Sequence, residues 1–119
     1  MTKNTDKCSI QGRHGCPIEA LMQVIGGKWK PVILYYLSLE TRRFGELNRL
    51  IPNISQRMLT QHLRELEAHG VVHREVYKEV PPKVEYSLTE FGETLHPLLT
   101  SMNDWAERHL PEVDQVQAD

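Results

Sequence analysis

Apolar side chains recur at helical spacing along five segments of the chain. Each segment is bounded by residues that commonly start or stop a helix, such as Pro17 at a start and Gly26-Gly27 and Gly70 at an end. The pattern therefore predicts five helices, at residues 17–25, 28–39, 45–51, 55–69 and 89–110.

The fourth predicted helix divides most clearly into an apolar face and a polar face. Ser55 is a good N-cap, and Leu59, Leu63 and Leu66 follow at spacings that place them on one side. The opposite side then turns outward with the polar residues Gln56, Arg57, Thr60, Gln61 and Arg64. Taken alone, this face is also what an ordinary surface helix presents.

Two stretches after this helix alternate with a period of two, which is typical of strands. They are residues 72–77 and 84–88, and residues 80–83 (VPPK) lie between them as a hairpin tip. Arg42-Arg43-Phe44 is a candidate short strand, and a turn at Pro52-Asn53 joins the third and fourth helices. The expected fold is therefore α+β, a winged helix-turn-helix that is mostly helical with a small antiparallel wing hairpin.

The size and composition of the chain are those of one domain with a modest core. Its 119 residues are 39% hydrophobic and 25% charged, which excludes a disordered or membrane-embedded protein. We expect a flexible lead at residues 1–15, the folded domain at residues 16–110 and a disordered tail at residues 111–119. The N-terminus lacks the apolar stretch of a signal peptide, so we expect a cytoplasmic location in which Cys8 and Cys16 are thiols at rest.

Charge is unevenly distributed along the chain, although the formal net charge is only -2. Residues 28–83 carry ten Lys and Arg against six Asp and Glu, whereas residues 85–119 carry one Arg against eight Asp and Glu. A basic middle favours an anionic partner such as DNA. A solvated surface gives the same pattern, so the charges alone leave both interpretations open.

The residues predicted to face outward have the chemistry of base recognition. In helix-turn-helix units the second helix enters the major groove, where Arg pairs with guanine and Gln with adenine. Lysines near the wing tip and arginines before the third helix supply positive charge for phosphates. The predicted DNA-binding residues are Arg43, Ser55, Gln56, Arg57, Thr60, Gln61, Arg64, Lys78 and Lys83, with Arg42 as a further candidate.

Cys16 is a candidate for redox chemistry. If Pro17 is the first helical residue, Cys16 is the cap, where the helix dipole favours a reactive thiolate. The alternative is a small residue packed at the start of a helix. Cys8, His14 and Cys16 do not have the spacing of a zinc site, and no nucleophile pairs with a histidine. We therefore expect no metal, no cofactor and no enzymatic activity.

The strings GGKWK, RFGEL and PPKVEYSLT, in this order, resemble the HxlR type of bacterial winged-helix regulator over about residues 16–108. The resemblance implies a homodimer whose two recognition helices meet successive major grooves of a near-palindromic operator. It implies an interface between the first and last helices, here Leu21, Met22, Leu98, Met102 and Trp105. Several such regulators sense oxidants, quinones or aldehydes through a cysteine before the first helix, and Cys16 stands at that position.

The resulting prediction is a DNA-binding transcriptional regulator, with a thiol switch at Cys16 as a hypothesis. One alternative is a regulator controlled by a small molecule in an interhelical pocket lined by Trp29, Tyr35 and Trp105. Another is a winged-helix protein-interaction module without DNA binding. The basic residues of the fourth helix argue against that module.

Overall fold

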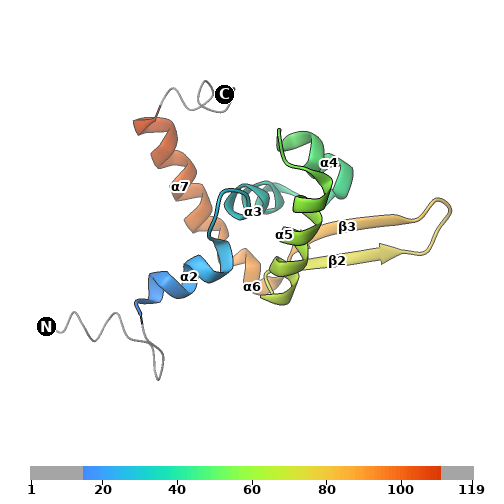
Figure 1. The fold of residues 1–119 in the computed structure, drawn as a ribbon, viewed down its shortest axis with the longest axis horizontal. Helices are drawn as coiled ribbons and strands as arrows, with labels where there is room; N and C mark the ends of the chain where they lie inside the picture. Colours follow the sequence, from blue (N-terminus) through green and yellow to red (C-terminus); the bar gives the residue numbers. More distant parts are fainter. Residues whose placement is uncertain (1–14, 111–119) are drawn as a thin grey trace, which may run out of the picture.

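The described part of the chain contains six helices and three strands, arranged as Figure 1 shows. The computed structural model describes residues 15–110, so Cys8, the tail and all of the expected lead except Gly15 lie outside the described residues. The elements are α2 (Pro17–Ile25), α3 (Lys30–Leu39), β1 (Arg42–Arg43), α4 (Phe44–Leu50), α5 (Gln56–Ala68), β2 (Val72–Tyr77), β3 (Lys83–Leu88), α6 (Glu90–Glu93) and α7 (His96–His109). The predicted α+β architecture is confirmed.

Helices α4 and α5 form the expected helix-turn-helix unit. Asn53 in the turn adopts a φ of 73°, a left-handed conformation that asparagine tolerates better than most residues. Ser55 caps α5 as predicted, because its Oγ accepts a hydrogen bond of 3.1 Å from the Met58 N–H. Gly70, with a φ of 80°, follows the other end of α5. The local sequence therefore fixes both ends of this helix.

The hydrophobic core lies between the helix-turn-helix unit, α3 and the base of the sheet. Helix α3 is central, since it contacts both α7 and β3. It buries Ile33, Leu34 and Leu37, while α5 buries the predicted row Leu59, Leu63 and Leu66. Fixing one side of α5 in this way leaves its opposite side exposed.

The three strands form an antiparallel sheet in the order β1-β3-β2. Val72 pairs with Leu88 at the base of the hairpin, and Tyr77 pairs with Lys83 at its far end. The strand that the alternation predicts at residues 72–77 is confirmed, and only Val72 of this strand is buried. The reason is that the hairpin extends beyond the helices as a wing (Figure 1), so no helix in the described part of the chain covers its outer part.

The C-terminal region folds as two helices, and the prediction of one helix over residues 89–110 is wrong. Thr89 caps the short helix α6, its Oγ1 accepting a hydrogen bond of 2.9 Å from the Gly92 N–H. Pro97 lies in the first turn of α7. Proline has no N–H to donate and its ring interferes with a preceding helical turn, so a new helix begins here.

None of the helices in the described part of the chain is both long enough and apolar enough to span a membrane.

Candidate nucleic-acid interface

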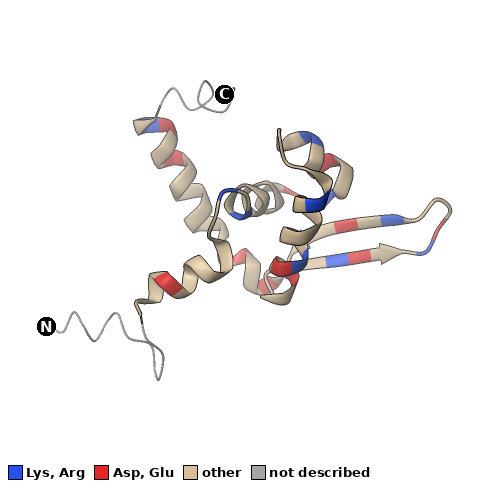
Figure 2. Cartoon of the chain, viewed as in Figure 1, with Lys and Arg blue, Asp and Glu red and all other residues tan. Residues whose placement is uncertain are grey.

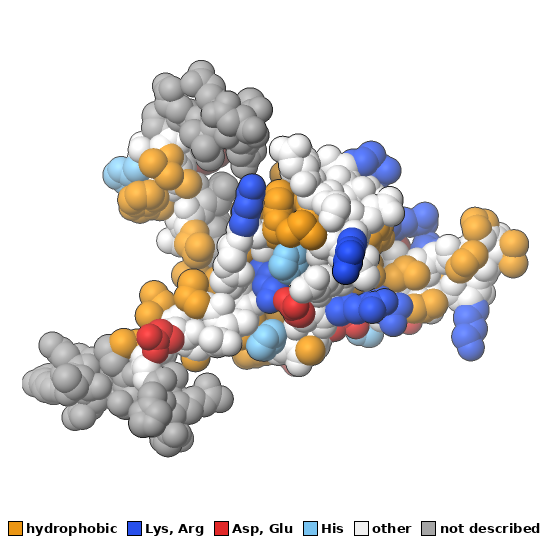
Figure 3. Space-filling view, viewed as in Figure 1, with side chains coloured by type: hydrophobic (Ala, Val, Ile, Leu, Met, Phe, Trp, Pro, Cys, Tyr) orange, Lys and Arg blue, Asp and Glu red, His pale blue; other side chains and the backbone are white. Residues whose placement is uncertain are grey.

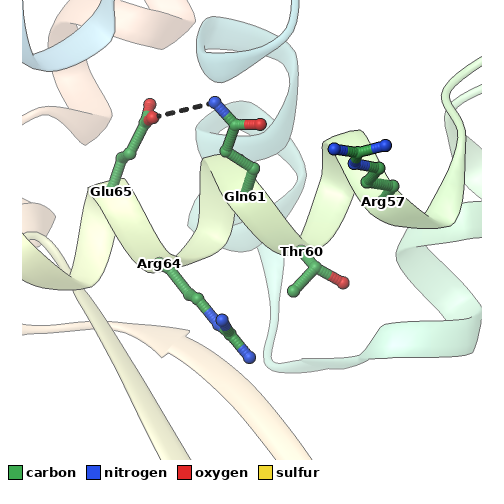
Figure 4. A pocket seen from close by; sticks show the side chains of 5 residues that line it. All are labelled: Arg57, Thr60, Gln61, Arg64 and Glu65. Carbon is green, nitrogen blue, oxygen red and sulfur yellow. Dashed lines mark hydrogen bonds between the residues drawn. The ribbon is translucent and has the colours of Figure 1, made fainter.

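The exposed side of α5 carries a row of polar side chains beside a shallow depression of about 410 Å³. Figure 4 shows Arg57, Thr60, Gln61, Arg64 and Glu65, which line this depression. Arg57, Gln61 and Arg64 are exposed and Thr60 is half-buried. The structure therefore brings four of the predicted DNA-binding residues together on one helix, and it adds a carboxylate, Glu65, that the sequence analysis did not select.

Three further predicted residues lie at the amino ends of the two helices of the unit. Ser55 and Gln56 are exposed at the start of α5, where the Ser55 hydroxyl is engaged as the cap. Arg43 is exposed at the N-cap of α4, and its N–H donates to Glu46 Oε1 at 2.8 Å. These positions place three further polar side chains at the amino ends of α4 and α5.

Arg42 differs from its neighbour Arg43, because its side chain is only 13% exposed. Its Nε donates to the Tyr36 carbonyl at 3.3 Å, and its Nη1 lies 2.9 Å from Glu40 Oε2. These contacts tie Arg42 to the end of α3. Arg42 is therefore less available to a phosphate than Arg43 in this conformation.

The two wing lysines have different surroundings. Lys78 is exposed in the turn between the strands, whereas Lys83 belongs to β3 rather than to the tip. The Lys83 Nζ lies 3.8 Å from Glu85 Oε2 and 4.5 Å from the centre of the Tyr77 ring. The negative charge of Glu85, followed by burial, raises the pKa of Tyr77. Lys78 is consequently the more available of the two lysines.

Glu65 links α5 to α3. Its Oε1 lies 2.6 Å from Lys30 Nζ, and its Oε2 accepts a hydrogen bond of 3.2 Å from Gln61 Nε2. The bond from Lys30, followed by the bond from Gln61, lowers the pKa of the Glu65 carboxyl group. The spacing of four residues between Gln61 and Glu65 is a signal available in the sequence. The contact with Lys30 is not, because it joins two separate helices.

Positive and apolar side chains are segregated on the molecule. Figure 2 shows Lys and Arg on α4, α5, the wing and the far end of α7, and no Lys or Arg on α2. Asp and Glu also lie on α4, α5 and the wing. In the space-filling view, hydrophobic side chains gather along α2 and α7, on the side away from the wing (Figure 3). The described part of the chain therefore carries most of its Lys and Arg on the helix-turn-helix unit and the wing, and it has a separate apolar face along α2 and α7.

The predicted interface residues form most of that apolar face. The exposed fraction is 46% for Met22 and 54% for Trp105, and Leu98 and Met102 are also exposed. Leu21 is partly buried against the core instead. Ile18, which the sequence analysis did not select, is 63% exposed on α2. Both helices thus present side chains that no contact within the described chain covers fully.

Cys16 is the N-cap of α2, as predicted, with Pro17 in the first turn. The Cys16 N–H donates to Glu19 Oε1 at 3.0 Å, which places a carboxylate at this end of the helix. Cys16 is half-buried. It is disulfide-bonded in the structure, in contrast to the thiol expected at rest.

Comparisons with known proteins agree with this geometry. The family model described as HxlR-like helix-turn-helix matches residues 24–114. The uncharacterized HTH-type transcriptional regulator YdeP of Bacillus subtilis (strain 168) is 57% identical over 88% of this chain and 82% of its own length.

Two solved structures of the redox regulator HypR are also similar. The oxidized form has a TM-score of 0.77 at 57% identity, covering 79% of this chain and 97% of the other. The reduced form has a TM-score of 0.74 at 52% identity, covering 87% of this chain and 99% of the other. With its fold, its exposed α5 row and these similarities, the chain belongs to the HxlR-like helix-turn-helix family of DNA-binding transcriptional regulators, which is not a family of enzymes.

Proposed function

We propose that this DNA-binding transcriptional regulator acts as a homodimer that reads a near-palindromic operator and is switched by oxidation or electrophile modification at Cys16. The observation that carries the proposal is the row of exposed polar side chains on α5, next to a protruding wing and separate from the apolar face of α2 and α7. Since the operator is chromosomal DNA, a cytoplasmic location belongs to the same proposal.

Helix α5 reads the bases in this proposal, and the flanking groups hold the DNA backbone. Arg57, Gln61 and Arg64 project into the major groove, where each good base contact contributes about 1–3 kcal/mol of discrimination. Thr60 and Gln56 contact a thymine methyl group or a phosphate. Phosphate contacts come from Arg43, Ser55, Lys78 and Lys83, which position the protein without selecting sequence.

The apolar face of α2 and α7 joins the two subunits. Met22, Leu98, Met102 and Trp105 are exposed in the single chain, with Leu21 beside them closer to the core. A cluster of exposed large apolar side chains is unfavourable in water and is typical of an interface. A twofold axis through this face turns the two α5 helices toward successive major grooves, about one helical turn of DNA apart.

The position of Cys16 supports the switch. It caps α2, the helix that carries Ile18 and Met22 of the apolar face. A covalent change at this cap therefore acts within about one helical turn of the subunit interface and alters the separation of the two α5 helices. A coupling of about 1.4 kcal/mol changes the DNA affinity tenfold. The similarity to HypR, a redox regulator by its printed description, favours the same role here.

The test measures binding to the DNA region upstream of the protein's own gene. Fluorescence anisotropy at a fixed salt concentration reports the affinity. The full-length protein is compared after reduction with dithiothreitol and after treatment with diamide, together with Cys16→Ser. We expect about nanomolar binding in one redox state, reversal by dithiothreitol, and no response to diamide in the serine variant.

Each part of the proposal fails on a different result. Equal affinity for the upstream region and for unrelated DNA would discard operator reading. A diamide response that persists in Cys16→Ser would discard the role of Cys16. A small molecule that shifts the affinity equally in wild type and Cys16→Ser would favour control by a ligand between the helices.

A further inference from the structure

The two oxygens of the Glu65 carboxylate have different partners. Oε1 lies 2.6 Å from Lys30 Nζ of α3, and Oε2 lies 3.2 Å from Gln61 Nε2, one turn earlier on α5. Figure 4 shows the amide nitrogen of Gln61 turned toward Glu65 and its carbonyl oxygen turned the other way, toward the side of Arg57. Glu65 therefore stands between a core helix and one exposed amide of the α5 row.

The chemistry of the carboxylate fixes which end of that amide faces it. An ionised carboxylate accepts hydrogen bonds and donates none, so only the NH₂ group of Gln61 can point toward it. The lowered pKa of Glu65 keeps it ionised at neutral pH. The Gln61 Oε1 accepts no hydrogen bond within the described part of the chain.

Lys30 holds the carboxylate in this orientation. Its side chain is only 13% exposed, against 42% for Glu65. Lys30 is the first residue of α3, the helix that packs against both α7 and β3. His62 Nδ1, at 3.7 Å from Glu65 Oε1, lies at the same carboxylate oxygen. Lys30 on α3 thus contacts Glu65, and Glu65 in turn contacts Gln61 on the exposed side of α5.

We propose that Glu65 is a positioning residue that sets the base preference of Gln61, by holding its amide so that the free carbonyl oxygen accepts from a base amino group. In the major groove only adenine N6 and cytosine N4 offer such a donor, while guanine O6 and thymine O4 are acceptors. Through this oxygen, Gln61 therefore selects adenine or cytosine on the strand it contacts. This inference rests on the proposed reading of DNA by α5.

The variant Glu65→Gln separates orientation from charge. A glutamine at this position can either accept from the Gln61 NH₂ group or donate to Gln61 Oε1, so the Gln61 amide is no longer fixed and can turn its NH₂ group toward the base. Removal of a negative charge also strengthens binding to every duplex through the phosphates, whatever the sequence. The two effects differ, because only the first changes the preference at one base position.

Glu67→Gln is the matched control. Glu67 lies on the same helix, and its Oε2 is 3.6 Å from Arg74 Nε of β2. The substitution removes the same charge and also breaks an ion pair, without touching the Gln61 amide. A general effect of charge or of helix stability therefore appears in both variants.

The experiment selects bound sequences from a pool of random-sequence double-stranded DNA with the full-length protein. Wild type, Gln61→Ala, Glu65→Gln, Glu67→Gln and the double variant Gln61→Ala/Glu65→Gln are compared, and thermal unfolding checks each fold. The position whose preference disappears in Gln61→Ala identifies the base that Gln61 reads. Lys30→Met provides a second way of releasing the carboxylate.

We expect adenine or cytosine at that position in wild type, and a shift of preference of about tenfold toward guanine or thymine in Glu65→Gln. Lys30→Met is expected to weaken the preference for adenine or cytosine, as Glu65→Gln does. Glu67→Gln is expected to keep the wild-type preference. When Gln61 is already alanine, Glu65→Gln is expected to have no further effect at this position, because the two residues act as a unit.

Three results would overturn the inference while leaving operator reading intact. They are an unchanged preference in Glu65→Gln, the same shift in Glu67→Gln, and a wild-type preference for guanine or thymine at the Gln61 position. A wild-type protein that selects no motif would overturn the proposed reading of DNA by α5, and this inference with it.

Discussion

Replacement of Trp105 by alanine tests whether the α7 face joins two subunits. Trp105 is 54% exposed, and the ring of His109 lies 4.7 Å from its own, centre to centre. A whole tryptophan offers about 240 Å², so covering the exposed part removes about 130 Å² from water. At about 25 cal/mol per Å² this contributes about 3 kcal/mol per subunit, or about 6 kcal/mol for both subunits of a symmetric dimer.

The dissociation constant of the dimer is therefore expected to rise in Trp105→Ala by up to about ten-thousandfold, because about 6 kcal/mol corresponds to about four powers of ten and the area estimate is an upper bound. Sedimentation equilibrium over a range of concentrations measures it. The matched control is Val80→Ala, which removes apolar surface from the wing turn, where Val80 is 99% exposed. A dissociation constant that is unchanged in Trp105→Ala, or equally raised in Val80→Ala, would refute the assignment of the interface to α7.

Two further predictions concern DNA reading and alkaline stability. Arg57→Ala should lower the affinity for the selected operator by about 1–3 kcal/mol and leave binding to unrelated DNA nearly unchanged. Lys78→Ala should weaken binding to both DNAs and reduce the slope of log affinity against log salt concentration by about one. If Arg57→Ala weakens binding to both DNAs equally, Arg57 contacts a phosphate and not a base. Burial raises the pKa of Tyr86 above 10.0, so its neutral form stabilises the fold below pH 10 and this contribution is lost as the pH rises further. Urea unfolding of Tyr86→Phe should therefore show a weaker fall in stability above pH 10, and an identical fall would contradict this cause.

Local sequence determined the elements and much of the candidate interface. Ser55 and Gly70 set the ends of α5 because capping and left-handed turns depend on neighbouring residues. The row of leucines at 59, 63 and 66 then decided which side of α5 is buried, and hence which polar residues are exposed. The periodicity of apolar residues predicts the burial of α5 correctly because only one face of this helix packs against the core.

Other features depended on what packs against each element. The alternation of β2 predicts a strand but not its burial, and its residues after Val72 are exposed in the wing. Lys83 was expected at the tip, but pairing with Tyr77 places it in the strand beside Glu85. Residues with the same local pattern therefore differ in burial, because burial is set by distant elements.

Only the tertiary structure decided how Gln61 is oriented and which arginine is available. Lys30 meets Glu65 because α3 and α5 pack together, 35 positions apart in the sequence at the point of contact. Arg42 and Arg43 are adjacent and identical in type, yet Arg42 is bound to Tyr36 and Glu40 while Arg43 is exposed. Sequence determines which groups a chain carries and the helices and strands they occupy. Their partners are determined by the packing of those elements, since hydrogen bonds and ion pairs form only over a few ångströms.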